Sequence, residues 1–140
     1  MTRYACVPVD RWTLVLTNGP HGTDVGVLPS QAARELGIRA IRAVVDEGPM
    51  YPARILEVFG PGGDPVLAGG RAVVAANDGG RWVFETSGNP YDFEDLEAYN
   101  KRKKSDRFTS AMVHKYLRAL GVPIDVEPSW RDARVVATSR

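Results

Sequence analysis

The stretch AANDGGRWVFETSGNP, residues 75–90, contains the strongest turn signal of the chain. Its Asp-Gly dipeptide lies between two apolar runs, and glycine supplies the positive φ that tight hairpin turns require. A four-residue loop at 77–80 predicts a β-hairpin with Ala76 opposite Arg81. One face of this hairpin is expected to lie in the core, because it combines two small or branched side chains with two aromatic ones: Val73, Ala75, Trp82 and Phe84.

The opposite face of the same hairpin is also mostly apolar. It is expected to present Ala72, Val74, Ala76 and Val83, edged by Arg81 and Glu85. Two explanations fit this two-sided pattern. Helices cover both faces, which is the commoner arrangement, or one face is open and meets a partner or a ligand.

Further extended segments precede the hairpin. Branched and apolar residues predict strands at 12–17, 38–46, 51–59, 66–76 and 81–86. The last four are separated by sequences rich in turn residues: EGPM, GPGGDP and NDGG. Short turns between consecutive strands predict an antiparallel meander of four to five strands.

Two helices are predicted on either side of this meander. Ser30 is expected to cap a short helix that runs through Leu36 and ends at Gly37. Asp92 is expected to cap a longer helix that runs to about Lys104. That second helix would begin with acidic residues and end with basic ones, which complements the helix dipole.

A third helix is expected to begin at Thr109 or Ser110 and to end at Gly121. Its apolar side chains recur at helical spacing and form one stripe: Phe108, Met112, Val113, Tyr116, Leu117 and Leu120. Strands followed by helices predict an α+β fold, with one antiparallel sheet and three helices packed on it. We expect one domain over 1–140, with an irregular tail at 123–140 and an edge strand at 134–137.

The composition is that of an ordinary globular protein. The chain has 140 residues, a net charge of +1 and one cysteine, which excludes an internal disulfide. A charge so close to zero gives no overall attraction to nucleic acid or to an anionic membrane. The N-terminal residues lack the apolar core of a signal peptide, so a cytoplasmic protein without a membrane partner is expected.

Catalytic signals are weak throughout the sequence. His21 and Asp24 lie together in a turn-rich loop and could form half of an acid–base pair, but a solvated turn is the favoured interpretation. His114 is expected on the flank of the third helix. The two histidines and Cys6 have no zinc spacing, and the GPGGDP loop lacks the ending of a phosphate-binding loop. We therefore expect no metal and no cofactor, and an enzyme is not the favoured interpretation.

The basic run KRKKSDR, residues 101–107, allows two interpretations. It could be a patch that binds nucleic acid or an acidic partner. The favoured interpretation places it at the end of the second predicted helix, where its charges balance the acidic start and where Glu97 pairs with Lys101 one turn away. Nucleic-acid binding is accordingly not expected.

The order of motifs in the chain resembles that of a group of small actinobacterial proteins. The motifs are NDGGRWVFETSG, FEDLEAY and DRFTSAMVHKYLRALGV, preceded by LPSQAARELGIR. Some members of this group look like immunity or accessory proteins of polymorphic toxin systems. The resemblance implies a protein that binds a toxin domain, and it transfers no catalytic residue.

The leading hypothesis is a non-enzymatic, immunity-like protein that binds and occludes a protein toxin. Its candidate contact residues are polar positions in the early loop and on the hairpin: His21, Asp24, Asp78, Arg81 and Glu85. The alternative is a small enzyme or ligand-binding protein of secondary metabolism that uses a cavity between sheet and helices. Arg71 and Glu57, both expected on the core face, would mark such a cavity, because an unpaired buried charge is costly.

Overall fold

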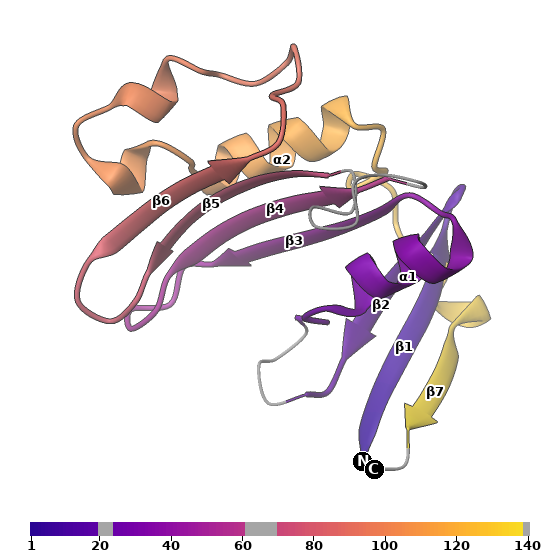
Figure 1. Ribbon diagram of the computed structural model, residues 1–140. Coiled ribbons are helices and arrows are strands. Elements are labelled where there is room, and N and C mark those ends of the chain that lie inside the picture. The colour runs from indigo at the N-terminus through magenta and orange to yellow at the C-terminus, as the bar shows by residue number, and fades with distance from the viewer. Residues whose placement is uncertain (20–23, 61–69, 139–140) are drawn as a thin grey trace. The chain divides into compact units, whose positions relative to one another are not determined.

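The computed structural model in Figure 1 describes residues 1–19, 24–60 and 70–138. The fold is α+β, with two antiparallel sheets and two α-helices among the described residues. The chain divides into two compact units, one formed by 1–26 together with 117–140 and the other by 27–116. The prediction of a single domain stays a prediction.

The larger unit contains the predicted meander. Its four strands are β3 (Ala40–Asp46), β4 (Ala53–Phe59), β5 (Arg71–Asn77) and β6 (Trp82–Ser87), paired in the order β3-β4-β5-β6. Every neighbouring pair is antiparallel. The predicted meander is therefore confirmed, and its strands begin two to five residues later than expected in three of the four cases.

The β5–β6 hairpin has its four-residue loop one position further along the chain than predicted. Asn77 ends β5 and pairs with Trp82, so the loop runs over 78–81. Asn77 stays in the strand because its backbone N–H donates to the carbonyl of Pro52 at 2.9 Å. The pairing shifts by two residues, with Ala76 opposite Val83 instead of Arg81. An even shift keeps each side chain on its face, so the predicted grouping of Val73, Ala75, Trp82 and Phe84 on one face is confirmed.

The segment that follows β6 covers this face without forming the predicted helix at 92–104. It contains only two short 3₁₀ turns, η1 (Ala98–Asn100) and η2 (Lys104–Asp106). The backbone is satisfied by side chains instead: the hydroxyl of Tyr116 accepts from the N–H of Asp95, and the Asp95 carboxylate accepts from Ala98. Tertiary hydrogen bonds therefore override the local helix preference.

Helix α2 (Ser110–Ala119) confirms the third predicted helix. Thr109 is its cap, because its side-chain oxygen accepts from the N–H of Met112 at 3.3 Å. Gly121, at φ +82°, ends it as expected. Five members of the predicted stripe are buried, namely Phe108, Val113, Tyr116, Leu117 and Leu120, whereas Met112 is half-buried.

Helix α1 (Leu28–Leu36) also confirms a prediction, with a different start. It begins two residues before Ser30, with Pro29 in its first turn, where the missing N–H costs nothing. The Ser30 hydroxyl donates to the carbonyl of Val27 rather than capping the helix. Gly37, at φ +63°, ends it in the left-handed conformation as predicted.

The smaller unit contains a second sheet that the sequence did not predict. Its order is β2-β1-β7, with β1 (Thr2–Val9) in the centre, β2 (Trp12–Thr17) on one side and β7 (Arg134–Thr138) on the other. The expected strands at 12–17 and 134–137 are confirmed, but both pair with β1. The prediction of one sheet is therefore wrong.

Candidate functional site

The centre of the larger unit is a cluster of four polar side chains, which we call the Arg71 network: Arg71, Glu94, Tyr99 and Tyr116. Arg71 projects from β5 into the layer between the sheet and segment 88–116. Its Nη2 and Nε donate to the two carboxylate oxygens of Glu94 at 2.7 and 3.0 Å. Its Nη1 donates to the carbonyls of Ser87 and Gly88 at 3.1 and 3.0 Å. One guanidinium thus joins β5, the end of β6 and the covering segment.

The two tyrosines complete the hydrogen bonding of this network. The hydroxyl of Tyr99 donates to Glu94 at 2.8 Å and lies 3.0 Å from the hydroxyl of Tyr116. Since the Tyr99 proton is used, Tyr116 donates to Tyr99, and it accepts from the N–H of Asp95 at 2.8 Å. The N–H of Tyr91 also donates to Glu94, at 2.7 Å.

The charge states in the network follow from these bonds. Burial opposes ionisation of Glu94, but the hydrogen bonds from Arg71, Tyr91 and Tyr99 outweigh it and hold the pKa of Glu94 below its usual value. Burial, together with the bonds to Tyr116 and Glu94, raises the pKa of Tyr99 far above that of an exposed tyrosine. Burial also raises the pKa of Tyr116. At neutral pH both tyrosines are therefore protonated and Glu94 is ionised.

This network is buried, and its polar groups are hydrogen-bonded. No buried side-chain nitrogen or oxygen lacks a hydrogen-bond partner in the described parts of the chain. The side chain of Glu94 is 1 % exposed, and that of Arg71 is 6 % exposed. A general base needs a free lone pair within reach of a substrate, and Glu94 has its oxygens engaged by Arg71, Tyr91 and Tyr99.

The other face of the same sheet is the second candidate region, and we call it the open face. On β4, β5 and β6, six of its apolar side chains are half-buried: Ala53, Ile55, Ala72, Val74, Ala76 and Val83. Of the described helices, α1 contacts β3 and β4. In Figure 1, α1 lies at one end of the sheet, whereas α2 and the segment before it run over the opposite side.

One ion pair crosses the open face. Arg42 on β3 and Glu57 on β4 are directly opposite each other in the ladder, and the guanidinium donates to the carboxylate. Glu57 is in turn opposite Ala72, and Ala72 is opposite Ser87 on β6. A row across all four strands thus combines a charge pair with a small residue and a hydroxyl.

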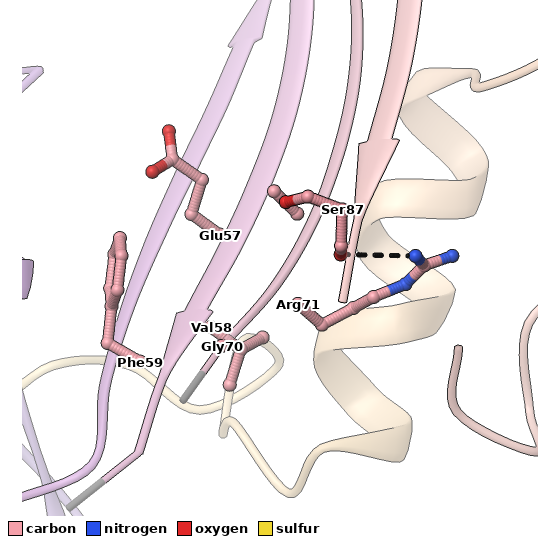
Figure 2. Close-up of a pocket in the computed structure, with 7 residues that line it drawn as sticks. Glu57, Val58, Phe59, Gly70, Arg71 and Ser87 are labelled. Atoms are coloured by element: carbon pink, nitrogen blue, oxygen red, sulfur yellow. Dashed lines mark hydrogen bonds between the residues drawn. The ribbon is translucent and has the colours of Figure 1, made fainter. Parts of the chain in front are cut away.

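A small pocket lies where this row meets the end of the sheet. Its volume is about 120 Å³, and its lining includes Glu57, Phe59, Gly70, Arg71 and Ser87. Figure 2 shows the side chains of Arg71 and Glu57 pointing to opposite sides of the sheet. The prediction that both lie on the core face is therefore right for Arg71 and wrong for Glu57, because the observed register places Glu57 opposite Ala72.

Three of the predicted contact residues belong to the β5–β6 hairpin. The Asp78 carboxylate accepts from the N–H groups of Gly80 and Arg81, each at 3.1 Å. These backbone hydrogen bonds lower the pKa of Asp78. Arg81 is exposed in the turn, and Glu85 is exposed on the open face opposite Val74. The structure thus brings Asp78 and Arg81 together in one turn and gives Asp78 a structural role.

The remaining two predicted contact residues, His21 and Asp24, belong to the early loop of the sequence. Asp24 accepts from the N–H of Gly26 at 3.0 Å, as expected for a turn residue. His21 lies outside the described residues. No group of three metal-ligating side chains occurs within 1–19, 24–60 and 70–138, and no helix there is long and apolar enough to cross a membrane.

The sequence predicts Arg71 as a buried polar residue but does not predict its partners. It places Glu94 in the first turn of the expected helix at 92–104 and Tyr116 in the apolar stripe of α2, and it gives no signal for Tyr99. A charged residue inside an apolar strand is itself a signal, because it requires a buried partner of opposite charge. The partner lies 23 residues away in sequence, beyond the reach of local patterns.

Comparison with known protein families, with curated proteins and with solved structures found no match for this chain.

Proposed function

We propose that this chain is a non-enzymatic protein-interaction module, and that its open face is the surface that meets the partner. The observation that carries the proposal is the exposure pattern of the sheet. Along β5, the apolar side chains of the open face, Ala72, Val74 and Ala76, are half-buried, whereas Val73 and Ala75 on the other face are buried. An apolar patch with a polar edge is typical of a protein-binding surface.

The charges around the patch fit such a surface. Glu85 lies on β6 at its edge, and Arg81 lies in the adjoining turn. Exposed rim charges of this kind steer association and select the partner, while the apolar centre supplies most of the affinity. The Arg71 network supports this role because it joins the sheet to segment 88–116 on the opposite face.

Within this class we favour an immunity-like protein that acts in the cytoplasm by binding and occluding a protein toxin. The resemblance of the motif order to immunity proteins supports this choice. Occlusion requires no catalytic residue in this chain, which agrees with Glu94, because both of its carboxylate oxygens are engaged in hydrogen bonds. The mechanism is steric, with Arg81 and Glu85 as rim contacts.

The test is to co-express the chain with proteins encoded beside its gene and to measure complex mass by light scattering. We expect a stoichiometric complex and protection of growth from the partner's toxicity. Ala76→Arg on the open face should abolish both, and Ala111→Arg on the exposed side of α2 is the matched control. Thermal unfolding of both variants shows that they are folded. Absence of any stoichiometric partner, or equal binding by the two variants, contradicts the proposal.

A second candidate function rests on the pocket beside Glu57 and Ser87. A carboxylate and a hydroxyl near a hollow can orient a small polar ligand, which would make the chain a ligand-binding protein or a small enzyme. The volume of about 120 Å³ is below the roughly 300–1,000 Å³ of most small-molecule sites. Thermal-shift screening against metabolites tests it, because a specific ligand raises the melting temperature, and Ala72→Leu should remove that shift.

A further inference from the structure

Four consecutive basic residues form the densest group of positive charge in the chain, and we call them the basic loop: Lys101, Arg102, Lys103 and Lys104. All four are exposed. The first three lie between η1 and η2, and Lys104 is the first residue of η2, so the group does not stand at the end of an α-helix. The predicted explanation by a helix dipole is therefore wrong, and so is the helical pairing of Glu97 with Lys101, because both require a continuous helix at 92–104.

The backbone of the basic loop is held in place by hydrogen bonds at both ends. The N–H of Lys101 donates to the carbonyl of Ala98 at 3.1 Å, and Ala98 is buried. The carbonyl of Lys101 accepts from Nε of Arg107 at 2.7 Å. The carbonyl of Lys103 accepts from the N–H of Asp106 at 3.0 Å. A fixed backbone lowers the entropic cost of binding, because the charges are already displayed together.

The charges of the basic loop are not neutralised within the described chain. Arg71, Arg54 and Arg118 each form an ion pair with a carboxylate at 2.7 to 2.8 Å. Across residues 1–19, 24–60 and 70–138, none of the four basic-loop side chains forms one. Four adjacent, preorganised and unpaired cations attract an anionic partner.

We infer that the basic loop docks an acidic segment of the protein partner. This inference rests on the proposed function and adds the chemistry of the partner: a short run of aspartate or glutamate, bound by charge complementarity.

A nucleic acid fits the surroundings of the loop less well. Single-stranded nucleic acid binds through aromatic stacking as well as charge, and the two aromatic rings of β6 each already carry a guanidinium group. Arg107 lies over Phe84 at 5.6 Å, and Arg54 lies over Trp82 at 4.7 Å. The same covering segment also carries exposed acidic residues ahead of the loop, at Asp92, Asp95 and Glu97, which repel a long polyanion.

The experiment measures fluorescence anisotropy of a labelled octaglutamate peptide with the full chain, at low and high salt. One variant changes the four basic-loop residues to glutamine. The matched control changes four scattered exposed cations to glutamine, namely Arg11, Arg39, Lys115 and Arg131, so that net charge is the same. We expect the control to bind like the unaltered chain and the basic-loop variant to bind at least tenfold more weakly, with binding that weakens as salt rises.

Three results overturn the inference: no binding by the unaltered chain at low salt, equal loss in both variants, or tighter binding of an oligothymidine of equal charge. The last result would assign the loop to nucleic acid. Circular dichroism verifies that both variants are folded. The peptide assay needs no natural partner, so it can fail while the open-face complex forms, or succeed while no partner is found.

Discussion

The ion pairs on the two faces of the β3–β6 sheet differ in how far they are buried. On the covered face, Arg71 and Glu94 have side chains that are 6 % and 1 % exposed, and each makes several hydrogen bonds. On the open face, Arg42 and Glu57 are 18 % and 27 % exposed and meet across neighbouring strands. Both pairs join residues of opposite charge, but only the first is removed from water.

This difference assigns a different role to each face. A buried ion pair adds little net stability over an apolar pair, yet it fixes one arrangement, because breaking it leaves an unpaired buried charge. The Arg71 network thus specifies how segment 88–116 lies on the sheet. A half-exposed pair is partly solvated already, so the open face can exchange its contacts with water for contacts with a partner.

The largest expected effect comes from removing charge on the covered face. Glu94→Gln leaves Arg71 buried without a counter-ion and should lower the free energy of unfolding by about 3–5 kcal/mol. The matched change on the open face, Glu57→Gln, should cost less than about 1 kcal/mol, because water replaces the lost contact. Urea denaturation of both variants measures the difference. Equal losses would contradict the contrast between the faces.

A backbone position beside the network gives the second effect. Gly88 has φ +78°, and an added Cβ would lie 2.3 Å from the carbonyl oxygen of Gly70. Gly88→Ala should therefore cost about 2–4 kcal/mol, from left-handed strain and from the backbone shift it forces. Gly37→Ala is the control, because it has φ +63° and open space around it. It should cost about 1–2 kcal/mol, and a loss equal to that of Gly88→Ala would show that the close approach to Gly70 has no energetic role.

The local sequence predicts the hairpin and helix α2 better than it predicts segment 92–104 and strand β1. The β5–β6 turn, to within one residue, the stripe on α2 and the faces of β5 and β6 follow from periodicity and turn chemistry, because each depends on neighbours in sequence. The helix expected at 92–104 fails because Glu94 and Asp95 have tertiary partners. The strand β1 is not predicted from the sequence, because Pro8 lies inside it and a proline argues against a strand interior.

The candidate surfaces show the same limit. The apolar composition of the open face was evident from the alternation along β5, but whether a helix covers it depends on how distant elements pack. The basic run is evident in the sequence. Its explanation by a helix dipole fails because segment 92–104 does not form a continuous helix. Local patterns therefore located both regions, whereas the packing around each region depends on tertiary structure.

The hydroxyl of Tyr116 tests how far the network acts as a unit. Tyr116→Phe leaves the N–H of Asp95 without its acceptor and removes the donor to Tyr99, so we expect a loss of about 1–3 kcal/mol in urea denaturation. Tyr51→Phe is the control, because Tyr51 is 58 % exposed. In the double-mutant cycle with Glu94→Gln, the two losses should not add, because both residues bond to Tyr99. Strict additivity would mean that Tyr116 and Glu94 act independently.

Acid should act on the covered face through Glu94. The folded-state pKa of Glu94 is lowered, whereas an unfolded glutamate titrates near about 4.3. Its contribution is therefore complete above about pH 4.3 and is lost as the pH falls through the folded pKa, because protonation then favours the unfolded chain. The Glu94→Gln side chain cannot titrate, so the stability of this variant should fall less steeply below that pH than the stability of the unaltered chain.

Urea midpoints between neutral and acidic pH measure the two slopes, with sucrose added to both samples to keep the variant folded. Glu47 and Asp78, whose pKa values are also lowered, remain in both proteins, so the difference between the slopes reports Glu94. Parallel curves of stability against pH would mean that ionisation of Glu94 does not contribute to stability. The contrast between the two faces would then rest on geometry and not on burial of charge.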